Sequence, residues 1–83
     1  MIIYTAELNG CSAIIIPLGE NFWRWSACRE DGSGGKGDWR PTLRGAKDEA
    51  SRALKSLAFG YNQSLWNKAK VRFKKEKIPD ADL

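Results

Sequence analysis

The chain has 83 residues, a formal net charge of +4 and a hydrophobic fraction of 42%, a composition that fits one small globular domain and excludes a disordered polymer. It contains no histidine and only two cysteines, so it cannot form a Ser/His/Asp triad, a His-rich metal site or a zinc-binding cysteine cluster. Its longest apolar run, residues 13–16, is far too short to cross a bilayer.

Three strands are predicted at residues 2–8, 11–16 and 22–29 from their β-branched and aromatic content. The Asn9-Gly10 dipeptide between the first two strands tolerates positive φ at both positions, which is a strong hairpin signal. The predicted unit is therefore a three-stranded antiparallel meander. The N-terminal residues lack the basic segment and cleavage site of a signal peptide, so we expect a cytoplasmic protein.

Symmetric turns would pair facing residues of neighbouring strands in a fixed register. The expected pairs are Leu8–Cys11, Ala6–Ala13 and Tyr4–Ile15 in the first hairpin, and Ile16–Trp23, Ile14–Trp25 and Cys11–Cys28 in the second. A bulge in either turn would exchange the two faces of one strand. The facing cysteines could form a disulfide in an oxidising compartment, but we expect free thiols in the cytoplasm.

This register divides the meander into two faces. The face expected to pack on a helix carries Ile3, Thr5, Ile14, Ile16, Trp23, Trp25 and Ala27. The second face carries Ile2, Tyr4, Ala6, Leu8, Cys11, Ala13, Ile15, Arg24, Ser26 and Cys28. Because the second face is more apolar than an exposed sheet needs, either the C-terminal segment covers it or it contacts a partner. We favour the C-terminal segment, since so small a domain needs all the surface it can bury.

A glycine-rich loop is predicted at residues 30–41. Its Gly-Gly-Lys-Gly sequence superficially resembles a phosphate-binding loop, but Gly37-Asp38 follows the lysine where a P-loop needs Ser or Thr and a helix. We therefore expect a flexible hairpin loop. Trp39-Arg40 is a candidate for a short strand segment at the edge of the sheet, which Pro41 would end. The aspartates of this region are expected to serve turns rather than acid–base chemistry or metal binding.

A long helix is predicted over residues 42–59. Thr42 is suited to the N-cap, and Gly60 is suited to end the helix. Apolar residues recur at helical spacing, at Leu43, Ala46, Ala50, Ala53, Leu54, Leu57 and Ala58.

Residues 64–77 are ambiguous, because they alternate as a half-buried strand would and also place apolar residues on one helical face. We favour a second helix, since most of these residues are good helix formers. The predicted fold is a single α+β domain in which the meander, residues 2–29, packs on the helix and a basic C-terminal segment, residues 60–83, follows.

The charge is unevenly distributed along the chain. Residues 1–43 carry four basic and five acidic groups, whereas residues 44–77 carry ten basic and three acidic groups. Such a basic half favours anionic partners, nucleic acid first, although a merely solvated face has the same composition. The densest basic run, suited to phosphate contact without sequence reading, is Lys68, Lys70, Arg72, Lys74, Lys75 and Lys77.

The order of three strands, a loop and Pro41-Thr42 before an Ala-rich helix resembles the arm-type DNA-binding domains of tyrosine integrases and the AP2-like fold, over residues 2–58. The resemblance implies a sheet that enters the groove of duplex DNA. The chain departs from that pattern in its second and third strands, whose only basic groups are Arg24 and Arg29.

The short chain, its Trp-rich hairpin at residues 22–25 and the Ala-rich helix from Ala46 to Ala58 are similar to small orphan proteins of phages and mobile elements, among them anti-CRISPR inhibitors. This resemblance implies a non-enzymatic protein that inhibits a host defence complex, a protein or ribonucleoprotein, by occupying its surface. Because the chain is basic, such an inhibitor would grip an acidic protein surface or cover nucleic acid. The alternative is a basic βββα module that binds double-stranded nucleic acid.

The residues predicted to contact the partner come from the loop and the basic run: Lys36, Trp39, Arg40, Lys70, Arg72 and Lys74. The meander has no obvious need of Trp39, and interface hot spots favour Trp and Arg. The basic run would steer an anionic partner. We expect no metal, cofactor or membrane partner, and a homodimer is an alternative assembly.

Overall fold

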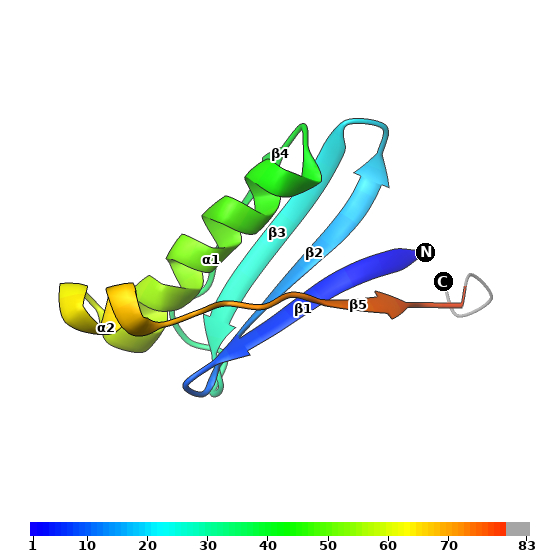
Figure 1. Ribbon diagram of the computed structural model, residues 1–83. Coiled ribbons are helices and arrows are strands. Elements are labelled where there is room, and N and C mark those ends of the chain that lie inside the picture. Colours follow the sequence, from blue (N-terminus) through cyan, green and yellow to red (C-terminus); the bar gives the residue numbers. More distant parts are fainter. Residues whose placement is uncertain (80–83) are drawn as a thin grey trace.

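The computed structural model describes residues 1–79 and shows one antiparallel sheet with a long helix on one of its faces (Figure 1). The elements in chain order are β1 (Ile2–Leu8), β2 (Cys11–Gly19), β3 (Phe22–Arg29), β4 (Lys36–Arg40), α1 (Leu43–Phe59), α2 (Gln63–Lys68) and β5 (Lys74–Lys77). The five strands lie in the order β4-β3-β2-β1-β5. The α+β prediction is confirmed. The last four residues of the predicted C-terminal segment lie outside the described residues.

The first hairpin forms in the predicted register. Asn9 and Gly10 have φ values of 49° and 81°, as the type I′ turn requires, and Leu8 pairs with Cys11. Tyr4 accordingly pairs with Ile15.

The register predicted for the second hairpin is wrong by one residue. The pairing shifts between Pro17 and Gly19, so Ile15 instead of Ile14 lies opposite Trp25. Proline cannot donate a ladder hydrogen bond, and a bulge at such a residue exchanges the faces of the strand that precedes it. The predicted Cys11–Cys28 pair therefore does not form: the two cysteines lie on opposite faces of the sheet, and both thiols are free.

The core lies between α1 and the centre of the sheet. The helix contributes Ala46, Ala50, Ala53, Leu54 and Leu57, and the sheet contributes Ala6, Cys11, Ala13, Ile15, Trp25 and Ala27. The two tryptophans of β3 face α1 as predicted. Because the register is shifted, however, the β1 and β2 side chains that face α1 beside them are those predicted for the second face. Because alanines line both sides of the contact, the helix can approach the sheet closely.

The ends of α1 follow the sequence signals. The Thr42 side chain accepts a hydrogen bond from the Gly45 backbone N–H at 3.0 Å, which caps the first turn. Gly60 ends the helix with φ of 61°, and its N–H donates to the Ser56 carbonyl at 2.8 Å.

The predicted second helix is wrong beyond Lys68. Residues 69–73 leave α2 without regular structure, and β5 then adds to β1 as an edge strand. Val71 and Phe73 pack against the core on the helix side. The two residues are two positions apart, and an extended chain directs such side chains to the same side, so both can reach the core. The predicted second face of β1 and β2 is thus covered mainly by α1, and the C-terminal segment adds only Val71 and Phe73 before β5 extends the sheet sideways.

The predicted loop is shorter than expected, because β4 pairs with β3 from Lys36 to Arg40. Gly37 makes this pairing possible: a Cβ atom there would lie 3.1 Å from the Trp25 carbonyl oxygen. The glycine thus serves a close strand contact rather than loop flexibility.

Candidate binding surface

Within residues 1–79 no helix covers one face of the sheet, and we call it the open face (Figure 1). Strand alternation and the observed register place these side chains on it: Ile3, Thr5, Glu7, Ser12, Ile14, Ile16, Phe22, Arg24, Ser26, Cys28, Trp39, Lys74 and Glu76. The open face combines isoleucines, two aromatic rings, small polar residues and charges of both signs.

The centre of the open face is hollowed into a trough of about 760 Å³. Every strand of the sheet contributes to its lining. The floor is low because the residues that point into it are short: Thr5, Ser12, Ser26, Cys28 and Gly37. Longer side chains on both flanks leave these positions recessed, so a convex partner surface could enter the trough.

An aromatic pair stands at the β4 side of the trough. The Phe22 and Trp39 ring centroids are 5.1 Å apart with the planes tilted by 41°, and Trp39 is 47% exposed. Arg24 is the cross-strand partner of Trp39, and its side chain is exposed beside these rings. This arrangement presents the residue types that most often anchor protein interfaces.

Charged residues stand at the β5 side. Glu76 accepts a hydrogen bond from the Thr5 hydroxyl at 3.3 Å. Arg72, Lys74 and Glu7 line a smaller hollow there, of about 310 Å³, together with Glu76. Five strands spaced about 4.8 Å apart separate this side from the aromatic pair by roughly 19 Å.

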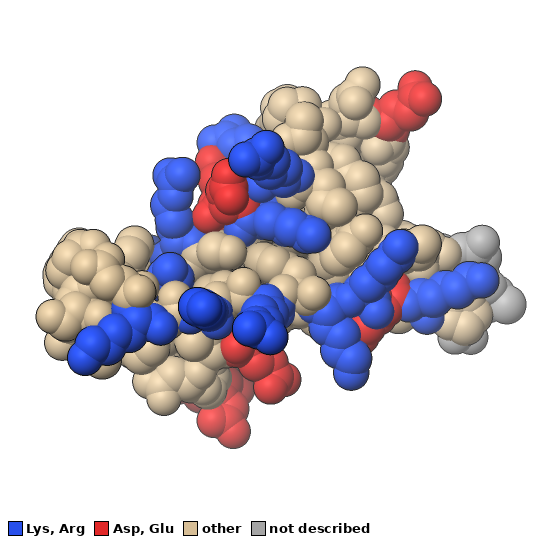
Figure 2. Space-filling model, in the orientation of Figure 1, with Lys and Arg blue, Asp and Glu red and all other residues tan. Residues whose placement is uncertain are grey.

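Four of the six predicted contact residues, Lys36, Trp39, Arg72 and Lys74, border the open face. Lys70 is exposed between α2 and β5. Figure 2 shows that lysines and arginines gather along this C-terminal part of the chain.

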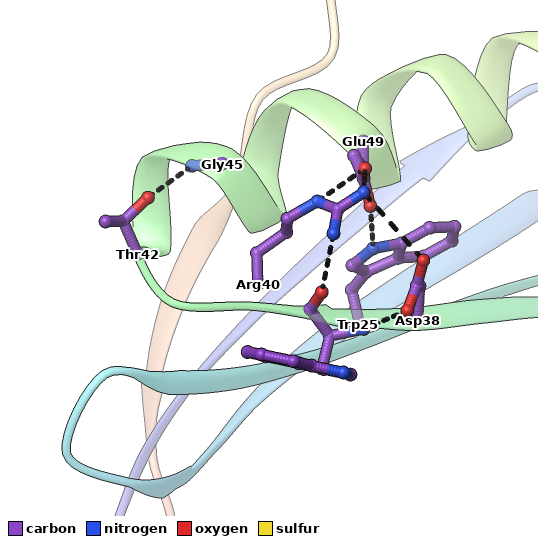
Figure 3. Close-up of polar contacts among 7 residues, drawn as sticks. Trp25, Asp38, Arg40, Thr42, Gly45 and Glu49 are labelled. Carbon is purple, nitrogen blue, oxygen red and sulfur yellow. Dashed lines mark hydrogen bonds and ion pairs between the residues drawn. The ribbon is translucent and has the colours of Figure 1, made fainter.

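Arg40 and Lys36 belong mainly to the contact between β4 and α1, and Figure 3 shows the contacts of Arg40. The Arg40 Nε donates to Glu49 Oε2 at 2.6 Å, and its Nη2 pairs with the same carboxylate. Glu49 also accepts from Trp25 Nε1 at 2.9 Å. The Lys36 ammonium donates to the Ser56 hydroxyl at 3.3 Å, although its chain lines the trough edge.

The sequence prediction missed the centre of the surface, above all Arg24, Ser26 and Ile14. The prediction places Ile14 on the helix side because it assumes a symmetric second turn. The signal that could have corrected it is Pro17, which a regular inner strand does not accommodate.

The acidic groups near the loop serve local structure. Asp31 Oδ1 accepts from the Ser33 backbone N–H at 2.9 Å, and hydrogen bonds from the Ser33 hydroxyl and N–H lower the pKa of Asp31. Between residues 1 and 79, no three His, Cys, Asp or Glu side chains gather as a metal site. No helix in the same range is long and apolar enough to cross a membrane.

Comparisons of the chain with protein-family models, with curated proteins and with solved structures gave no match.

Proposed function

We propose that this protein is a non-enzymatic binding protein that holds a partner protein on its open face. The observation that carries the proposal is the Phe22–Trp39 pair, with Trp39 exposed beside Arg24, at the border of a trough that has a floor of short side chains and charges of both signs in its lining. Aromatic residues and arginine are enriched in protein interfaces, where they anchor the centre and polar groups form the rim.

Two features favour a protein over duplex DNA as the occupant of the open face. Glu7 and Glu76 stand on it and would repel phosphates. The sheet is also about 19 Å wide, whereas the major groove is about 12 Å wide, so the face cannot enter the groove flat as the arm-type resemblance implied. Charges of both signs suit a protein surface, where each can find an opposite partner.

The trough gives a direct test through Ser26, which is exposed and lies at its floor. Ser26→Tyr fills the trough without entering the core, whereas Ser64→Tyr adds the same ring to exposed α2. A photo-crosslinking residue is introduced at position 26 or 64, and the adducts formed in the host cell are identified by mass spectrometry. We expect one protein to be captured from position 26 and not from position 64.

Affinity for the captured protein is then measured with purified components. Ser26→Tyr should weaken it at least tenfold, and Ser64→Tyr should leave it within twofold. Equal crosslinking from both positions, or an unchanged affinity of Ser26→Tyr, would show that the open face is not the binding surface.

The resemblance to anti-CRISPR inhibitors leads us to propose a host defence complex as the partner. In cells with an active CRISPR system, expression of the protein should restore transformation by a targeted plasmid, and Ser26→Tyr should abolish this protection. Unchanged interference across a panel of system types would overturn the choice of partner, while the crosslinking result would still decide whether the open face binds a protein.

A further inference from the structure

The β5 edge of the sheet carries a second surface, which we call the basic edge. It consists of cations on the C-terminal segment and on the neighbouring flank of α1: Arg44, Lys47, Lys68, Lys70, Arg72, Lys74, Lys75 and Lys77. Figure 2 looks onto this edge and shows a row of lysines and arginines from α2 to β5, with a further group over α1. Within residues 1–79 none of these eight cations forms an ion pair.

Contacts between elements hold the two groups of cations together. The Lys47 ammonium lies 4.8 Å from the centroid of the Tyr4 ring, and Tyr4 is the cross-strand partner of Lys75. Cations from α1 and β5 thus flank one ring of β1. Residues 44–77 are spread over two helices and a strand, so it is the fold that gathers their charges on one side.

Protection of an exposed sheet edge explains only part of this charge. Lysines on an edge strand discourage pairing with another chain, which accounts for Lys74, Lys75 and Lys77 on β5. It does not account for Arg44 and Lys47 on a helix, nor for the cations before β5. Unpaired cations at this density raise the local potential and favour a polyanion.

We infer that the basic edge binds the phosphate backbone of duplex nucleic acid without reading its sequence. The nine residues from Ala69 to Lys77 would span about 26 Å when extended, which is about three quarters of the roughly 34 Å rise of one turn of B-DNA. Single strands stack on exposed rings among the cations, but the rings within the edge, Tyr4 and Phe73, are half-buried, and the exposed Tyr61 lies before α2. Membrane surfaces need freely exposed apolar anchors among the cations, but Val71 and Phe73 are half-buried and pack against the core.

Binding of a fluorescent 20-base-pair duplex of arbitrary sequence tests the inference by anisotropy at 50, 100 and 200 mM NaCl. If the edge contacts about six phosphates, affinity should fall about 10³-fold between 50 and 200 mM, because each neutralised phosphate releases counterions. A duplex of different sequence should bind within about threefold. A salt-independent affinity would overturn the inference.

The decisive variant is Lys70→Glu/Lys75→Glu/Lys77→Glu, whose positions are exposed and off the open face. It should bind duplex at least tenfold more weakly at 50 mM NaCl, while the three Lys→Arg replacements should bind as the natural protein does. The matched control Arg24→Glu/Lys36→Glu/Arg52→Glu makes the same change in net charge away from the basic edge and should stay within threefold. Circular dichroism and thermal unfolding check that each variant is folded.

Two results would contradict the inference. Equal losses in both triple variants would mean that net charge alone attracts DNA. Binding to vesicles containing phosphatidylserine without binding to duplex would assign the edge to a membrane surface. Ser26→Tyr leaves the basic edge intact, so its affinity for duplex should be unchanged. Failure of the basic-edge inference can therefore be distinguished from failure of the open-face proposal.

Discussion

At the residue scale, Trp39 differs from Trp25, although both lie in the sheet. Trp25 is buried and donates to Glu49, whereas Trp39 is 47% exposed and contacts Phe22 on the open face. Trp39→Ala should therefore weaken partner binding by about 2 kcal/mol or more. It should lower the free energy of unfolding by only about 1 kcal/mol, the worth of one aromatic pair. Calorimetric titration and urea unfolding separate the two effects, and a large stability loss with unchanged affinity would place Trp39 in the core.

Glu49 contributes to stability instead of partner binding, because its carboxylate accepts hydrogen bonds from both Arg40 and Trp25. Glu49→Ala leaves the partly buried indole N–H and the guanidinium without this acceptor, so we expect a loss of about 1–3 kcal/mol in urea unfolding. Glu49→Gln keeps an acceptor for the indole and should lose less. If Glu49→Ala unfolds at the same urea concentration as the natural protein, the network does not fasten β4 to α1.

At the element scale, the extra residue between Pro17 and Gly19 decides which side chains of β1 and β2 lie on the same face of the sheet as a given side chain of β3. Deleting Leu18, which is 53% exposed, would favour the symmetric register and turn Trp25 away from Ile15. A one-residue slip exchanges whole faces, so we expect this variant not to fold cooperatively in thermal unfolding. Leu18→Ala keeps the chain length and should change stability by less than about 0.5 kcal/mol. A native-like transition of the deletion variant would show that the bulge is dispensable.

At the scale of the whole molecule, the two ends of the described chain close the sheet. The Met1 amino group donates to the Ile78 carbonyl at 2.9 Å, and the Ile78 N–H donates to the Met1 carbonyl at 2.7 Å. Truncation after Ala69 removes β5 with Val71 and Phe73, and it exposes the β1 edge. We expect a lower melting temperature and self-association through β1 in light scattering, because an unpaired edge templates strand addition. A stable monomer of unchanged melting temperature would contradict this role of β5.

Local signals in the sequence correctly predicted the features that depend on interactions between neighbouring residues. Asn9-Gly10 specifies its turn by positive φ, Thr42 caps the nearest helical turn, and alanine periodicity marks the buried side of α1. These features depend on residues at most a few positions apart. The α+β class followed from them.

The tertiary structure decided what depends on distant pairing. Whether residues 74–77 form a strand depends on the free edge of β1, and Val71 and Phe73 become buried only once that edge has placed them beside the core. Arg40 became structural because Glu49, nine positions away, faces it across the β4–α1 contact. The open face, with Arg24 and Ser26 beside Ile14, exists only in the shifted register. Sequence alone cannot rank such alternatives, because their energies differ by side-chain burial that only the assembled sheet and helix create.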